Sequence, residues 1–220
     1  DIMKKFYEAG SMEWRFTGGE ATIYPDLFDA MSIAKGFGMN VSLNTNGWWS
    51  QKTAERIFQA DISEMVISLE GRAPVNDERR KRGSFDRVME VFDMIRDHNA
   101  SSPEKAISIV VNTSIGRDNV DNAEFVARLA AQYGFNLTFL PVKPSGRARD
   151  LCQNDMLSPY EWMKFSEEVQ RLREDPEIAG SNIKISHNYK DLFCPTAPDK
   201  SDKPYPFNYA ECGALTTAIS

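Results

Sequence analysis

Short apolar runs alternate along this chain with stretches whose apolar residues recur at helical spacing. Each run predicts a strand, and each stretch between two runs predicts a helix. The runs Val66–Leu69 and Ser108–Asn112 are almost continuously apolar, as in parallel strands that are covered on both faces. The expected strands are 13–17, 40–44, 64–69, 106–112 and 136–141, and the expected helices are 1–9, 25–36, 51–59, 85–99 and 119–133.

Alternating strands and helices indicate βαβ units, and therefore an α/β fold built on a parallel sheet. The pattern divides the chain into three segments. Residues 1–150 hold the alternation, and residues 151–180 hold one more amphipathic helix, for which Ser158, Pro159 and Glu161 form an N-terminal capping signal. Residues 181–220 are rich in Pro and Asp and follow no helical or strand period before a strand-like end.

Composition narrows the classes of function. The formal net charge of −6 disfavours a general nucleic-acid binder, which needs a basic surface. No run of 18 apolar residues predicts a membrane span, and no secretion signal is recognised, so a cytoplasmic protein is expected. The three cysteines, an odd number, do not suggest a framework of disulfides.

The turn Gly18-Gly19-Glu20 follows the first predicted strand directly. Parallel α/β folds bind ligands at the carboxyl ends of their strands. Glycines let the backbone approach a ligand, and a glutamate offers a carboxylate to an ammonium group. The turn alone favours an ordinary glycine-rich surface turn over a ligand site, and it does not match GxGxxG.

The next two strands also end in small or polar residues, Asn44–Gly47 and Ser68–Gly71. In a parallel barrel these ends converge on one face. A basic run, 79–82, follows them and is either a solvated charge run or, through Arg80, a partner for a carboxylate. A glutamate for an amine and an arginine for a carboxylate together describe a pocket for a free amino-acid group.

With these segments the chain resembles the radical S-adenosylmethionine (SAM) superfamily, and within it the proteins with a SPASM or related C-terminal extension. The matching segments are FTGGE, LNTNG, ISLEG, the ND..R..GSFDRV stretch and FLPVKPSGRA, in order from Phe16 to Ala148. The resemblance implies a partial (β/α)6 TIM-like barrel over residues 1–150, with the last barrel helix in 151–180. Its first strand is expected to precede Asp1, and residues 181–220 would begin an iron–sulfur extension.

The resemblance also implies a SAM site at the strand ends. Gly18, Gly19 and Glu20 would hold the methionyl amine, and Ser68 and Arg80 would bind the carboxylate and nearby polar groups. Thr45 would lie at the ribose or methionyl end, and Leu140 would pack near the adenine. Glu70 stands where many relatives have Asp.

The family's [4Fe–4S] cluster needs three cysteines in a CxxxCxxC motif, which these 220 residues do not contain. We expect that motif upstream of Asp1; the alternative is a protein that has lost the cluster. Cys194 and Cys212, the latter followed by Gly213, are expected to ligate an auxiliary [4Fe–4S] cluster together with further ligands. The alternative for these two cysteines is free thiols.

The resemblance thus implies an enzyme that cleaves SAM reductively and abstracts hydrogen from a peptide or protein, as in peptide natural-product maturation. Flavodoxin or ferredoxin would supply electrons, and neither nucleic acid nor membrane is an expected partner. One alternative is a non-catalytic barrel that binds SAM or a peptide. Another is a TIM-barrel hydrolase, for which Glu70 and Asp77 are the acid–base candidates at strand ends.

Overall fold

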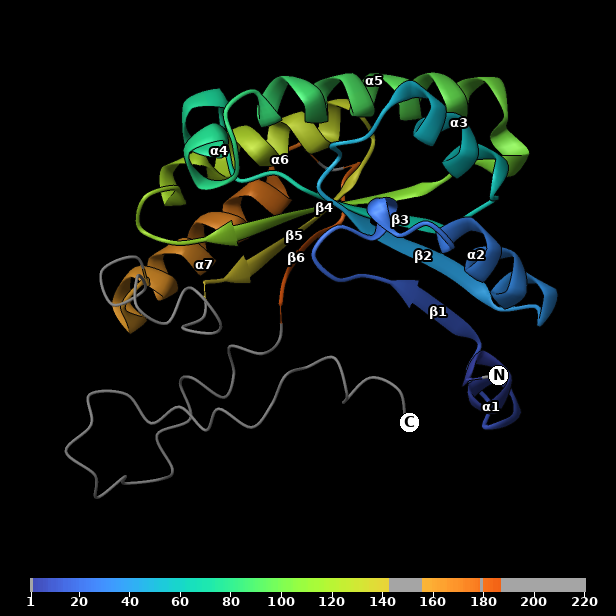
Figure 1. Cartoon of the computed structure of the whole chain (residues 1–220). Coiled ribbons are helices and arrows are strands. Elements are labelled where there is room, and N and C mark those ends of the chain that lie inside the picture. The colour runs from blue at the N-terminus through green and yellow to red at the C-terminus, as the bar shows by residue number, and fades with distance from the viewer. Residues whose placement is uncertain (1, 143–155, 179, 187–220) are drawn as a thin grey trace. The chain divides into compact units, whose positions relative to one another are not determined.

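The computed structural model describes residues 2–142, 156–178 and 180–186 (Figure 1). Residues 1–185 form one compact unit and 186–220 a second, and the description that follows concerns the first. Its centre is a six-stranded sheet in sequence order, and every neighbouring pair of strands is parallel. The strands are β1 (Glu13–Phe16), β2 (Asn40–Thr45), β3 (Glu64–Ser68), β4 (Ser108–Ile115), β5 (Asn136–Pro141) and β6 (Ile183–Ile185).

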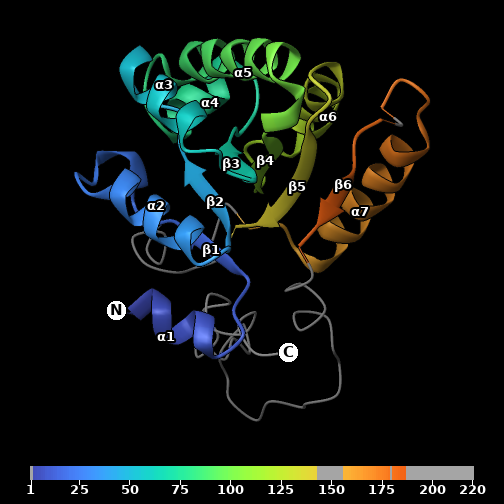
Figure 2. The same ribbon diagram turned by 90° about the vertical axis from the view of Figure 1, so that its right-hand side faces the viewer.

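Helices connect the strands and follow the outer side of the curved sheet (Figure 2). They are α2 (Leu27–Gly36), α3 (Gln51–Gln59), α4 (Ala73–Arg79), α5 (Ser84–Ser101), α6 (Ala123–Gln132) and α7 (Pro159–Glu174), and α1 (Ile2–Glu8) precedes β1. This arrangement confirms the predicted α/β class and the partial TIM-like barrel. The part of the chain that the structure describes contains no helix long and apolar enough to cross a membrane.

The two faces of the sheet differ in chemistry because side chains alternate along each strand. The outer face is apolar, and the helices cover it. Its fully buried side chains include Val41, Leu43, Met65, Ile67, Val111, Leu137 and Phe139. The inner face is more polar: Arg15 bonds Ser42 and Glu64 across its first strands. Farther along the sheet, the register aligns Ser68, Asn112 and Thr138 in one row across β3, β4 and β5. We refer to these three residues as the inner row.

The strands and helices predicted within the described residues all appear, with ends shifted by a few residues at most sites. One helix and one strand were missed, besides three short 3₁₀ helices, so the sheet has six strands where the pattern predicted five. The helix α4 is short and buries only Asn76, which leaves no apolar periodicity to detect. The strand β6 spans three residues and pairs with β5 alone. The capping box of α7 is confirmed: Ser158 accepts from the Glu161 nitrogen, and Glu161 accepts from the Ser158 nitrogen.

Candidate functional site

A cavity of about 580 Å³ lies at the carboxyl ends of β1, β2 and β3. It is lined by the turns that follow these strands and by the segment that joins α4 to α5. The lining residues are Gly19, Asn46, Trp48, Glu70, Arg79, Arg80, Lys81 and Ser84. Its volume is in the range of pockets that take small molecules.

Glu20 joins the turn after β1 to the turn after β2. Its Oε1 accepts from the hydroxyls of Thr22 (2.6 Å) and Thr45 (2.8 Å) and from the Thr22 nitrogen (3.2 Å). Its Oε2 accepts from the Asn46 nitrogen at 2.7 Å. The carboxylate therefore organises the glycine turn, and Oε2 retains acceptor capacity beyond the Asn46 bond.

Thr45 organises the turn after β2. Besides donating to Glu20, its Oγ1 accepts from the Gly47 nitrogen at 3.1 Å and from the Trp49 indole at 2.9 Å. Thr45 and Trp49 are each 5% exposed, so this hydroxyl bonds inside the fold. Trp48, in contrast, is 43% exposed, and Lys81 Nζ lies 4.3 Å from the centroid of its ring. The two adjacent tryptophans therefore have different roles, one in packing and one at the cavity.

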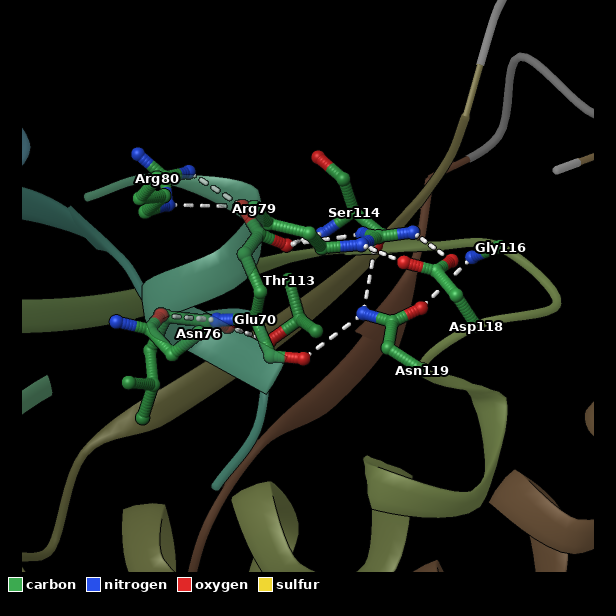
Figure 3. A network of polar contacts seen from close by, with 10 residues as sticks. Glu70, Asn76, Arg79, Arg80, Thr113, Ser114, Gly116, Asp118 and Asn119 are labelled. Carbon is green, nitrogen blue, oxygen red and sulfur yellow. Dashed lines mark hydrogen bonds and ion pairs between the residues drawn. The ribbon is translucent and has the colours of Figure 1, made fainter. Parts of the chain in front are cut away.

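Glu70 is the buried anion of the site, with 4% exposure (Figure 3). Its Oε1 accepts from Arg80 Nε at 3.0 Å and also from Arg80 Nη2. Its Oε2 accepts from the Ser114 nitrogen at 2.8 Å and lies 3.5 Å from Arg79 Nη1. One carboxylate thus contacts two guanidinium groups and the end of β4.

Asparagine side chains hold the backbone around Glu70. The Glu70 nitrogen donates to Asn76 Oδ1 at 2.9 Å, and its carbonyl accepts from Asn119 Nδ2 at 2.8 Å. Two residues on, the Arg72 nitrogen donates to Asn122 Oδ1 at 3.0 Å. Gly71 lies between them with φ +151°, and a Cβ there would come within 2.8 Å of the Asn122 side chain. Glu70 therefore projects from a backbone that is bonded on both sides.

The charges that line the cavity are mostly positive. Arg79, Arg80 and Lys81 carry three positive charges against the single negative charge of Glu70, and Arg79 is also paired with Asp118. The whole chain has a net charge of −6, so the cavity differs in sign from the protein around it. A ligand group of negative charge is favoured there.

Asp77 serves the fold at the start of α5. Its carboxylate accepts from the nitrogens of Phe85 (2.9 Å) and Gly83 (2.5 Å) and from the Ser84 hydroxyl. These bonds, that of Phe85 first, lower the pKa of Asp77 below its ordinary value. A carboxyl group with a lowered pKa is a poor general acid at neutral pH. Glu70 in turn contacts Arg79 and Arg80, so both acid–base candidates are engaged in contacts that hold the site together.

The structure brings most of the expected SAM-site residues to one end of the sheet. Gly19 and Arg80 line the cavity, and Glu20 is bonded to Thr45 beside it. Gly18 precedes them with φ +143°. Ser68 ends β3 and Leu140 lies on β5, and neither lines this cavity.

Some residues of the site were not identified from the sequence. Arg79, Lys81 and Ser84 line the cavity because α4 turns the basic run toward the strand ends. The basic run was the available signal, but α4 was not predicted. Cys152, Cys194 and Cys212 lie outside the described residues. Within the described ranges, no group of three or more His, Cys, Asp or Glu residues could hold a metal ion.

Comparisons with known proteins agree with this architecture. The family model of the "Radical SAM superfamily" matches residues 1–130. The mycofactocin maturase MftC of Mycolicibacterium smegmatis is 33% identical over 156 residues, which cover 66% of this chain and 38% of that protein. The AdoMet-dependent heme synthase of Oleidesulfovibrio alaskensis is 28% identical over 155 residues, with 68% and 38% covered. The chain thus spans about two fifths of the length of these relatives.

Solved structures share the fold at low sequence identity. The structure titled "Native anSMEcpe with bound AdoMet and Kp18Cys peptide" matches with a TM-score of 0.63 and 16% identity, covering 87% of this chain and 54% of that one. A domain of pyruvate-formate lyase-activating enzyme from Bacteroides vulgatus matches with a TM-score of 0.55 and 13% identity, covering 80% and 99%. Because the family model matches more than half of the residues of this chain, the chain belongs to the radical SAM superfamily.

Proposed function

We propose that this chain is the core of a radical SAM enzyme that modifies a peptide or protein. When SAM and a reduced [4Fe–4S] cluster are bound, they would supply a 5′-deoxyadenosyl radical that abstracts hydrogen from the substrate. The observation that carries the proposal is the cavity itself. It has a glycine–glutamate turn on one side and Arg80 on the other, at the converging ends of parallel strands.

The residues of the site fit the methionyl part of SAM, which carries one ammonium and one carboxylate group. The ammonium would lie at the turn formed by Gly18, Gly19 and Glu20. The carboxylate would lie at Arg80, with Ser68 among the nearby polar groups. A Cβ added at Gly19 would meet no atom within 4 Å, so the absent side chain leaves open space at a residue that lines the cavity.

The remaining site residues would act on the other end of SAM. Thr45 fixes the turn after β2 and would lie near the ribose or methionyl group. Leu140 on β5 would pack near the adenine. By holding these turns in place before the ligand arrives, the residues would lower the entropic cost of binding.

Within the described ranges no group of three or more His, Cys, Asp or Glu residues could hold a metal ion, and no CxxxCxxC motif occurs in the 220 residues. The proposal therefore requires three thiolates from outside these residues. We assign Cys194 and Cys212 to an auxiliary [4Fe–4S] cluster in the segment 181–220, whose first residues supply β6 of the barrel sheet before the chain continues beyond it. Both cysteines lie outside the described residues.

The substrate class rests on relatives. MftC is named a maturase, and one of the solved neighbours holds a bound peptide together with AdoMet. We propose a peptide or protein substrate in the cytoplasm and a flavodoxin or ferredoxin as the source of electrons.

The test is anaerobic expression from the complete reading frame, followed by iron and sulfide quantitation and an assay for 5′-deoxyadenosine after reduction with dithionite. We expect more than one [4Fe–4S] cluster per chain and formation of 5′-deoxyadenosine from SAM. The Cys212→Ala variant should lose up to one cluster's iron and keep the rest. A protein without iron that binds SAM but never cleaves it would replace the proposal with a non-catalytic binding barrel.

A further inference from the structure

Arg80 is bonded along only one edge of its guanidinium group. Nε and Nη2 both donate to Glu70 Oε1. In the ranges that the structure describes, Nη1 has no hydrogen-bond partner, although the side chain is only 27% exposed and lines the cavity. Because a guanidinium is planar, fixing one edge also fixes the direction of the other.

Glu70 is itself immobilised. Its second oxygen accepts from the Ser114 nitrogen at 2.8 Å and lies 3.5 Å from Arg79. Its backbone is held by Asn76 and Asn119. Glu70 therefore fixes the guanidinium of Arg80 relative to β3 and β4. Figure 3 shows these contacts.

This restraint matters because Arg80 follows a helix of only seven residues. A long side chain at such a position would otherwise lose rotamer freedom when it binds a ligand. With one edge already bonded, that loss has occurred before the ligand arrives. Glu70 and Asp118 together offset the charges of Arg79 and Arg80, and Lys81 leaves the lining of the cavity with a net positive charge.

We infer that Glu70 is a positioning residue, which presents the Nη1 edge of Arg80 to the carboxylate of SAM. The inference rests on the proposed function, since it takes SAM as the ligand of this cavity. It predicts that Glu70 affects how the carboxylate of SAM is bound and does not affect the binding of the other groups of SAM. The side chain must also be long enough to reach both Ser114 and Arg80, so Glu70→Asp should retain one of these contacts and lose the other.

The inference is tested by calorimetric titration of the full-length, anaerobically prepared protein with SAM and with decarboxylated SAM, which lacks the carboxylate. In Glu70→Gln, an amide NH₂ group would face either Ser114 or Arg80, both of which are donors. We expect its affinity for SAM to fall by about tenfold or more, the effect of one charge-assisted hydrogen bond, while the affinity for decarboxylated SAM changes by less than about twofold.

Three comparisons complete the test. Combining Glu70→Gln with Arg80→Lys should weaken SAM binding hardly more than Arg80→Lys alone, because the two residues act through one contact. Glu161→Gln removes a glutamate from a different arginine, far along the chain on α7, and should leave both affinities unchanged. Binding of decarboxylated SAM by each variant reports that its site is still folded.

Two results would overturn the inference. An equal loss of affinity for both ligands in Glu70→Gln and Glu70→Asp would show a general structural role. Unchanged SAM affinity in Glu70→Gln would show that Arg80 does not depend on Glu70. A wild-type protein that binds neither ligand would instead remove the proposed function, which is a separate and recognisable outcome.

Discussion

Thr45 Oγ1 donates a hydrogen bond of 2.8 Å to Glu20 Oε1 across 25 residues of sequence. The bond joins the turn after β1 to the turn after β2. The same hydroxyl accepts from Gly47 and Trp49, so it connects the carboxylate to the buried indole. The glycine turn is therefore braced from the neighbouring strand.

The bond between Thr45 and Glu20 gives a first prediction. Thr45→Val keeps the shape of the side chain but leaves the Gly47 nitrogen and the Trp49 indole without their acceptor. We expect a loss of unfolding free energy of about 1–3 kcal/mol and weaker SAM binding. Chemical denaturation and titration measure both. Thr45→Ser retains the hydroxyl and should lie close to wild type; a valine variant as stable as the serine variant would contradict the role of this hydroxyl.

Gly71 gives a prediction about the frame of the site. Gly71→Ala places a Cβ within 2.8 Å of Asn122 and at a φ of +151° that side chains rarely adopt. We expect a loss of unfolding free energy of about 1–3 kcal/mol, and denaturation curves measure it. If the clash with Asn122 is the main cause, Asn122→Gly, which also removes the Cβ that would lie 2.9 Å away, should recover part of the loss. A Gly71→Ala variant of unchanged stability would show that this backbone yields easily.

Gly19 gives the opposite prediction, an effect on binding with little effect on stability. A Cβ at Gly19 meets no atom within 4 Å, and the residue has no positive φ. Gly19→Ala should therefore keep the melting temperature of wild type. Because Gly19 lines the cavity, the added methyl group should weaken SAM binding by about tenfold or more, the scale of a steric defect of 1–3 kcal/mol. Equal SAM affinity in the two proteins would place the ligand elsewhere.

Glu161 gives a prediction about pH. Its bonds to Arg117 and then Ser158 lower its pKa from 4.5 to about 2. A lowered pKa in the folded state stabilises the protein above the unfolded pKa, and the contribution disappears as the pH falls from 4.5 toward 2. Between these pH values the wild type should therefore lose more stability than Glu161→Gln. Urea denaturation at pH 6 and at pH 3 measures the difference, and parallel losses in the two proteins would contradict it.

Much of the fold was readable from the sequence because each strand is a short apolar run between helical patterns. The runs at β3 and β4 predicted parallel strands, and SPYE predicted the start of α7. The elements that were missed lack such a signal. In α4 the helix is held by polar contacts of Asn76, and β6 is only three residues long.

The candidate site was predicted in part. The glycine turn and Arg80 were identified, since glycine and charge at strand ends have a direct chemical meaning. Glu70 was considered as an acid–base group, but its contact with Arg80 depends on where α4 places the arginine. Asn119 and Asn122 were missed because the sequence around a single asparagine does not reveal which distant backbone group it bonds.

The polar inner row has a consequence for how such a protein changes over evolutionary time. The apolar packing under the helices does not include Ser68, Asn112 and Thr138. Substituting them would therefore change the side chains that the barrel presents on its inner face and would leave the apolar core unchanged. Selection can therefore act on the two faces of one strand separately. A maturase and a heme synthase each match about 155 residues of this chain, which is the kind of divergence that this separation permits.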